Sequence, residues 1–319
     1  MISFLARRLV TLLTTLLVAA IVIFGVTEIL PGDPAAVMLG LTATPEMVAA
    51  LRTELGLDAP AFQRFFGWIF GFFTGDLGIS YAYRVPVAGL IAERLQVTLP
   101  LALMASFLAA TLGITLGALA ASRANSLVDS ALMASAQVGL AIPNFWFGIL
   151  MVLLFSITLG WFPAGGFPGW ETGFLNGFHA LFLPACALAL PQAAVLARLT
   201  RTAVLEALGE DFVRTARAKG LNAGQTLRRH VLRNAMVPVV TMLALQFSFL
   251  ITGTIIIENV FALPGLGRLI FQSVGGHDLV TVKSLVMIYV GAVILVNALV
   301  DMAYGLIDPR LRFGRGVGR

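Results

Sequence analysis

Charge is scarce in this sequence. Of its 319 residues, 12% are charged and 59% are hydrophobic, whereas about a quarter of an ordinary soluble domain is charged. The mean hydropathy is +0.94. This composition excludes a chain of ordinary soluble domains and indicates a protein that crosses a membrane several times. The single cysteine, Cys186, excludes an internal disulfide.

The motifs of common catalytic and metal sites are also lacking. The chain has no G-x-x-x-x-G-K-[ST] loop for a nucleotide, no H-E-x-x-H and no cysteine pattern for a metal. The three histidines, His179, His230 and His277, have no companions at catalytic or ligand spacing. We therefore expect no enzyme activity, no metal and no cofactor in this chain. The net charge of +5 is interpreted as a topology signal, and no nucleic-acid partner is expected.

Six uncharged runs are long enough to cross a membrane, which takes about 20 apolar residues. They lie at about 9–27, 98–122, 134–159, 178–197, 235–257 and 284–300, the last extending up to 306. The first run lacks a cleavage site of the A-x-A type after it, so it is interpreted as an uncleaved span. The predicted fold class is an all-α polytopic membrane protein with six transmembrane helices.

The basic residues predict the orientation of these spans. With the N-terminus in the cytoplasm, the inner segments hold 15 lysines and arginines and the outer segments hold 6, which together make the 21 in the chain. Cytoplasmic loops carry the excess of such residues. Both termini are therefore expected in the cytoplasm, and so is the segment 198–236.

The outer segment 28–97 is expected to contain two short helices. In 44–56, Thr44 can cap a helix, Pro45 suits its first position and Gly56 can end it. The aromatic, amphipathic stretch 59–75 is expected to lie along the outer membrane face. Within the second predicted span, Gly113 and Gly117 form a G-x-x-x-G pattern, which we interpret as packing within the chain.

The predicted spans hold almost no charge, which disfavours an ion-driven carrier. Asp301 is the one plausible intramembrane carboxylate, and its position near a span end favours an interfacial residue. An ion-driven secondary carrier that needs no ATPase remains the alternative function.

The cytoplasmic segment 198–236 is dense in charge. Its first half, "RTAVLEALGEDFVRTARAKG", predicts a helix with an apolar stripe at Leu205, Leu208, Phe212 and Ala216 and with Glu210 or Asp211 pairing with Arg214. A turn at 220–222 leads to a second helix at about 223–234, capped by Asn222 with Gln225 three residues on. Such a hairpin could dock on a soluble partner or lie on anionic lipid. The interleaved acidic residues favour the partner.

Several stretches resemble one family throughout the chain. They are "FLARRL", "LPGDPA", "ELGLDAP", "GDLGIS", "EALGEDFVRTARAKGL…HVLRNAMVPVVT", "ENVFALPGLG" and "LVDMAYGLIDPRLR". In this order they resemble the permease subunits of dipeptide/oligopeptide/nickel ABC importers. The resemblance implies the type I ABC importer permease fold in a bacterial or archaeal cytoplasmic (inner) membrane. Residues 1–30 would be an N-terminal transmembrane helix, 31–97 an extracytoplasmic segment, 98–306 the transmembrane domain and 307–319 a basic tail.

The resemblance also implies partners and a cargo. The partners would be a second homologous permease, two cytoplasmic ABC ATPase subunits, an extracytoplasmic substrate-binding protein and membrane lipid. The cargo would be di- or oligopeptides, although nickel complexes, glutathione and some sugars use permeases of similar sequence.

In this family an E-A-A-x-x-x-G loop contacts the ATPase. Aligned by its glycine, the pattern matches Ala216 and Gly220, whereas Arg214 stands at the glutamate position and the proline that follows is displaced to Pro238. The coupling residues expected from the resemblance are Glu210, Asp211, Arg214, Thr215, Ala216, Lys219 and Gly220. Polar residues of the spans either line a translocation path or join neighbouring helices by hydrogen bonds; they are Asn144, Gln192, Gln246, Ser248 and Thr252.

Overall fold

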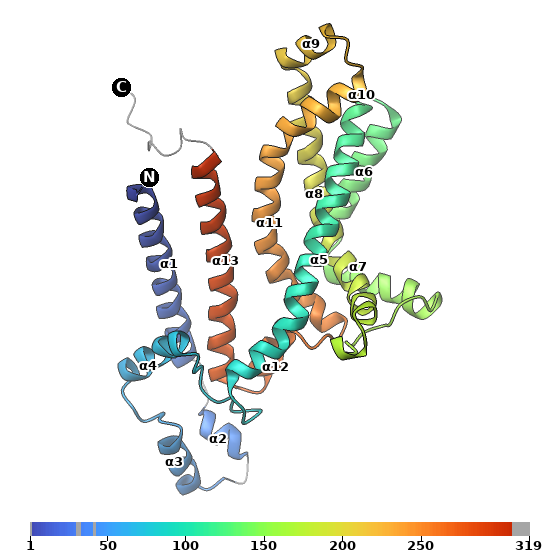
Figure 1. The fold of residues 1–319 in the computed structure, drawn as a ribbon. Coiled ribbons are helices and arrows are strands. Elements are labelled where there is room, and N and C mark those ends of the chain that lie inside the picture. Colours follow the sequence, from blue (N-terminus) through green and yellow to red (C-terminus); the bar gives the residue numbers. More distant parts are fainter. Residues whose placement is uncertain (1, 30–32, 41–42, 308–319) are drawn as a thin grey trace. The chain divides into compact units, whose positions relative to one another are not determined.

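The structure is a computed structural model that describes residues 2–29, 33–40 and 43–307, and over these ranges its regular elements are helical (Figure 1). An isolated antiparallel bridge joins Ile79 and Pro86. The chain divides into two compact units, one formed by 1–98 with 264–319 and the other by 99–263. Helix α5 (Val87–Ser122) runs from the first unit into the second.

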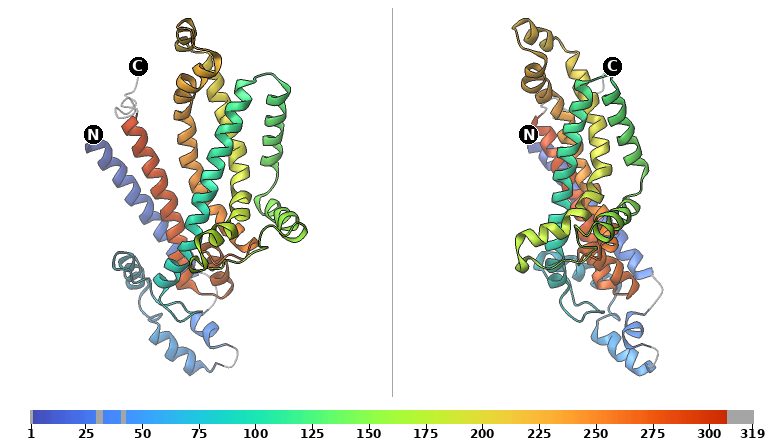
Figure 2. Two further views of the ribbon diagram at one scale, coloured as in Figure 1. Left: turned by 45° about the vertical axis from the view of Figure 1, so that its right-hand side comes forward. Right: turned by 90° about the vertical axis from the view of Figure 1, so that its right-hand side faces the viewer.

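The first unit is built on two long antiparallel helices, α1 (Ile2–Ile29) and α13 (Leu279–Ile307), which lie side by side in both figures (Figures 1 and 2). The start of α1 and the end of α13 therefore lie at the same end of this pair. The shorter helices of the unit are α2 (Pro34–Leu39), α3 (Pro45–Glu54), α4 (Ala61–Thr74) and α12 (Leu266–Gly275).

Both short helices expected in the outer segment are present. The Thr44 hydroxyl accepts from the backbone N–H of Met47 at the start of α3, and Gly56 adopts φ +67° just after its end. In α4, Trp68 is buried against Phe24 of α1, with 6.1 Å between the ring centroids. Packing on α1 thus accounts for the Trp68 face of α4, whereas Phe62, Phe66, Phe70 and Phe73 stay exposed. Its position along the outer membrane face stays a prediction.

The second unit is a bundle of α5, α6 (Leu127–Ala141), α8 (Phe174–Leu208) and α11 (Leu232–Val260), seen side by side in both figures (Figures 1 and 2). Helix α8 packs against both α6 and α11. A Cβ at Gly117 would lie 2.6 Å from the Cβ of Thr200 on α8, and one at Gly113 would lie 2.6 Å from that of Leu196. The G-x-x-x-G pattern therefore serves packing within the chain, as the sequence indicated.

Within the described residues, five helices are long and apolar enough to cross a membrane. They contain the predicted first, second, fourth, fifth and sixth spans. The third predicted span, about 134–159, is not one continuous helix but a bent pair of helical segments, which makes a sixth span if the pair is counted as one. Here α6 ends at Ala141, and α7 (Asn144–Met151), continued by a π-helical turn (Val152–Thr158), leaves it at a 102° bend. Ile142 is extended because it precedes Pro143, and that conformation ends the helix.

The prediction of one continuous helix through the first half of segment 198–236 is wrong. Helix α8 ends at Leu208, Glu210 is extended (φ −75°, ψ 151°), and a separate helix, α9 (Asp211–Ala218), follows. Val213 of α9 is buried in a core that it shares with Val204 and Ala207 of α8. Beyond the turn, α10 (Ala223–Thr226) and a π-helical turn (Leu227–Val231) lead directly into α11.

Candidate functional site

The segment between α8 and α11 forms a compact projection, which we call the knob (residues 209–231), at the end of the second unit's bundle (Figure 1). Its interior is apolar. Val213 is 1% exposed and Val231 is fully buried, and both pack in one cluster with Val204 of α8 and Val239 of α11. Because this core is continuous with the bundle, the knob is held on the long helices rather than on a loose loop.

Helix α9 presents charge outward from that core. Asp211, Arg214 and Lys219 are exposed, whereas Ala216 is 6% exposed and faces the core. Leu205, Leu208 and Phe212 of the expected apolar stripe pack against this core, but from two helices instead of one, and Val213, which the prediction did not include, lies within the core. Thr215 is exposed, and its hydroxyl donates to the carbonyl of Asp211, 3.1 Å away.

The charges of α9 are available to a partner. Arg214 Nη1 lies 3.8 Å from Asp211 Oδ1, and these side chains are 84% and 95% exposed. An ion pair as open as this one contributes little to stability. The expected pairing of Arg214 with Asp211 is thus confirmed as a loose contact, and both groups remain accessible.

The turn after α9 is set by one glycine and one cap. Gly220 has φ +86°, a region that L side chains rarely adopt, and a Cβ there would have no neighbour within 4 Å. The backbone conformation of the turn therefore requires glycine. The space beside Gly220 is open, so another molecule could approach its backbone closely. The predicted cap is confirmed: Gln225 N–H donates to Asn222 Oδ1 at 2.9 Å, and Asn222 N–H donates to Gln225 Oε1 at 3.1 Å.

Glu210 belongs to a different face of the knob. With Glu206, Asn234 and Pro238 it lines a groove of about 330 Å³ between the end of α8 and the start of α11. Both carboxylates are exposed. The structure therefore divides the expected coupling residues between the outer face of α9, the groove and, for Ala216, the interior.

Two of the candidate path residues join α8 to α11. Gln246 is 1% exposed, and its Nε2 donates to the carbonyl of Gln192 at 3.2 Å. Ser248 is buried with a hydroxyl that has no partner among the described residues, and Thr252 is exposed one turn further along. Asn144 is half-buried at the start of α7. The interhelical role is thus observed for the Gln246 side chain, with Gln192 contributing its backbone carbonyl, and path-lining stays a prediction for all five.

A polar contact that the sequence reading missed joins α6 to α8. Arg201 donates to both carboxylate oxygens of Asp129, from Nε at 2.6 Å and from Nη2 at 2.7 Å. The signal was present in "SLVD" (126–129), a cap pattern in which the hydroxyl of Ser126 accepts from the N–H of Asp129 at 3.3 Å. Local sequence could not show that the same carboxylate binds a residue 72 positions away.

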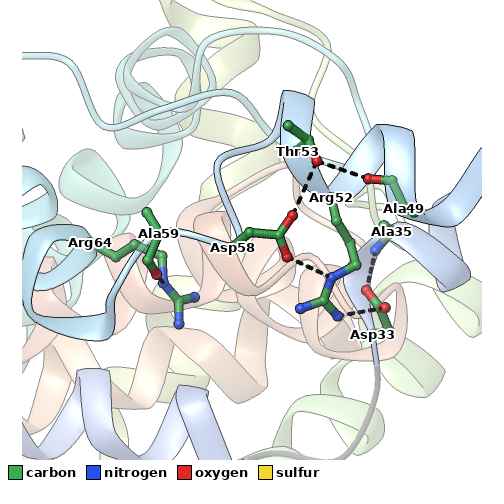
Figure 3. Close-up of polar contacts among 8 residues, drawn as sticks. All are labelled: Asp33, Ala35, Ala49, Arg52, Thr53, Asp58, Ala59 and Arg64. Atoms are coloured by element: carbon green, nitrogen blue, oxygen red, sulfur yellow. Dashed lines mark hydrogen bonds and ion pairs between the residues drawn. The ribbon is translucent and has the colours of Figure 1, made fainter.

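The outer segment of the first unit is organised by Arg52 (Figure 3). Its Nη1 lies 2.9 Å from Asp33 Oδ2 and its Nε lies 3.1 Å from Asp58 Oδ1. The hydrogen bond to Asp33, with that to Asp58, raises the pKa of Arg52 above its usual value. Asp33 also caps α2 by accepting from the N–H of Ala35. One guanidinium therefore holds together the start of α2 and the residues beyond α3.

A buried carboxylate closes the same unit at the start of α13. Asp278 is fully buried and accepts from the hydroxyls of Ser80 and Thr281 and, at 3.2 Å, from the N–H of Thr281. The contact to Ser80 spans 198 positions of the chain. Asp278 thus caps α13 and fixes the 79–86 turn to it. The side chain of Asp301 lies outside the described residues.

Long apolar helices and a bent helix pair together indicate a multi-pass membrane protein. Two family models match this chain. One, the binding-protein-dependent transport system inner membrane component, covers residues 113–313, and the N-terminal model of the same membrane component covers 1–102. The chain therefore belongs to the family of binding-protein-dependent inner membrane permeases, in the peptide branch of the ABC importers.

Named relatives agree with this assignment over nearly the whole chain. A Brucella abortus protein named as a peptide transport system permease is 41% identical over 98% of this chain and 100% of its own length. The glutathione transport system permease protein of Escherichia coli K12 is 38% identical over 98% of this chain and 100% of its own length.

A solved structure supports the fold. The inward-facing methionine ABC transporter MetNI contains a chain with TM-score 0.56 and 19% identity, covering 69% of this chain and 96% of that one. The type I importer permease fold expected from the sequence is thus confirmed. The chain is a non-catalytic, multi-pass component of the inner membrane.

Proposed function

We propose that this chain is one of two homologous permease subunits of a peptide importer, and that its knob transmits ATP-driven motion. Two cytoplasmic ATPase subunits hydrolyse the ATP, and an extracytoplasmic binding protein delivers the peptide. Both termini and the knob lie in the cytoplasm of a bacterium or archaeon. The observation that carries the proposal is the knob itself, with exposed charges on α9 and an apolar core shared with the long helices.

The contact with the ATPase is assigned to the outer face of α9. Asp211, Arg214, Thr215 and Lys219 offer charge and hydrogen bonds there, and Gly220 leaves room for a close approach. Ala216 is buried beneath this face and offers no charge to a partner. A rigid mounting matters because a displacement of α9 then moves the helices that cross the membrane.

Peptide is the proposed cargo because the relatives are named for peptide and glutathione, which is itself a peptide. Within the bundle, the path is proposed to pass Asn144, Ser248 and Thr252, with Gln192 and Gln246 between α8 and α11. Competition between labelled dipeptide, oligopeptide and glutathione for uptake by the reconstituted importer separates these cargoes.

The coupling assignment is tested with a charge reversal and a matched control. Arg214→Glu with Lys219→Glu is expected to leave insertion intact and abolish the stimulation of ATP hydrolysis by loaded binding protein. Arg228→Glu with Arg229→Glu makes the same charge change on exposed residues of the next turn. If only the first variant loses the stimulation of ATP hydrolysis, the result supports docking of the knob on the ATPase. If both variants lose this stimulation equally, the basic residues of the knob are assigned to a lipid contact. Normal stimulation in the first variant refutes the assignment to the ATPase.

A further inference from the structure

The ion pair between Asp129 and Arg201 is more completely enclosed than any surface contact of the knob. The Asp129 side chain is 4% exposed and that of Arg201 is 27% exposed. Besides the two bonds from Arg201, the carboxylate accepts at 3.0 Å from the N–H of Asn125, a residue at φ +62° in the turn between α5 and α6. Three donors thus hold one buried carboxylate, which ties that turn and the start of α6 to α8.

Arg201 lies close to the knob along the same helix. It is seven residues before Leu208, where α8 ends, which corresponds to about 10 Å along the helix axis. On another side of this stretch, Thr200 touches Gly117 of α5 so closely that no Cβ fits between them. The last turns of α8 are therefore locked to two neighbours, by close packing to α5 and by the ion pair to α6.

We propose that Asp129 and Arg201 are positioning residues that make α6 move with α8 as one body when the knob is displaced. Both oxygens of the carboxylate are engaged by a planar guanidinium, which fixes orientation as well as distance. The other polar link between these helices, Arg198 Nη1 to Gln137 Oε1 at 3.3 Å, joins exposed side chains by a single bond. The buried pair thereby extends coupling from the knob to the first half of the broken third span.

This inference rests on the proposed function, since it concerns motion driven through the knob. Its first test is a distance measurement on the assembled importer in lipid nanodiscs. Cys186 is replaced by serine, and spin labels are placed at Leu127 on α6 and Thr202 on α8, both exposed. Pulsed electron paramagnetic resonance gives their separation without nucleotide and in the ATP-trapped state. A second label pair, on Thr202 and a partner ATPase, reports that the cycle proceeds.

The separation of Leu127 and Thr202 is expected to be the same in both states, while the separation between Thr202 and the ATPase changes. In Asp129→Asn, the first distribution is expected to broaden or shift on ATP trapping. The proposal is overturned if, in the wild type, ATP changes the separation of Leu127 and Thr202 as much as it changes the separation between Thr202 and the ATPase. A chain in which neither pair responds to ATP contradicts the proposed function itself.

The second test separates coupling from stability. Arg201→Lys keeps the charge but cannot engage both oxygens in the same way. We expect this variant to assemble, to keep its basal ATP hydrolysis, and to lose about tenfold of the stimulation by loaded binding protein, within the usual range of coupling between sites. Arg198→Lys is the matched control and is expected to retain stimulation.

Exchange of the two residues, Asp129→Arg with Arg201→Asp, is expected to recover part of the stimulation that either single change removes. Full stimulation in Arg201→Lys refutes the proposal. The proposal is also refuted if basal and stimulated ATP hydrolysis fall in parallel in every variant, because that pattern indicates that the pair only stabilises the structure.

Discussion

Gly117→Ala offers a direct test of the packing between α5 and α8. The added Cβ would lie 2.6 Å from the Cβ of Thr200 and still closer to the carbonyl oxygen of Ala197. Both atoms are fixed to the backbone of α8, so no side-chain rotation relieves the overlap. The two helices must move apart, or α5 must shift along α8.

The expected magnitude follows from two opposing effects. Forcing an extra methyl group into a well-packed site destabilises a protein by about 1–3 kcal/mol. Alanine is favoured over glycine in a helix by up to about 1 kcal/mol. The net loss is therefore expected to reach up to about 2 kcal/mol in free energy of unfolding. Since 1 kcal/mol corresponds to about 2–4 °C in a domain of 150–250 residues, a fall of several degrees in the melting temperature is expected.

The control is Gly25→Ala in α1, because a Cβ at Gly25 would have no neighbour within 4 Å. Both variants are purified in one mild detergent, and their melting temperatures are compared with that of the wild type. Gly25→Ala is expected to melt at or slightly above the wild-type temperature. Equal melting temperatures for the two variants would show that α5 and α8 are not in the close contact described and would refute the reasoning.

Three further changes probe the remaining contacts. Asn222→Ala removes the cap and is expected to destabilise the start of α10 by about 1 kcal/mol, seen as faster hydrogen exchange near Gln225. Ser80→Ala removes a donor to the buried Asp278 and is expected to destabilise the protein by about 2 kcal/mol, as for other hydrogen bonds to charged groups, with unchanged melting as the contrary result. Arg52→Ala is expected to speed proteolysis within 33–58 and to leave the melting temperature nearly unchanged.

Local patterns predicted what depends on neighbours in sequence. Five apolar runs were identified as spans because length and hydropathy alone decide whether a helix can cross a membrane. The caps at Thr44 and Asn222 were readable for the same reason, since a cap bonds residues two or three positions away.

The polar contacts that fix the two units were not readable from local sequence. Asp129 and Arg201 are 72 positions apart, and Ser80 and Asp278 are 198 apart, so no local period relates them. The stretches "LPGDPA" and "ELGLDAP" contributed to the family resemblance, but the sequence alone did not show what Asp33 and Asp58 in them bind. The structure supplies one, because Asp33 and Asp58 both bind Arg52.

The prolines show why the third span is broken and the others are not. Pro100, Pro184 and Pro238 lie inside α5, α8 and α11, and each of those helices continues past its proline. Packed neighbouring helices can compensate for the hydrogen bond that such a proline removes. At Pro143 the chain instead uses the extended preference of the preceding residue and turns by 102°. The difference lies in the tertiary setting, because α7 packs against α8 and α11 through a glycine, Gly148, whose Cβ would meet Phe261. A proline in an apolar run therefore marks a position where a span can break, and the packing on its two sides decides whether it does.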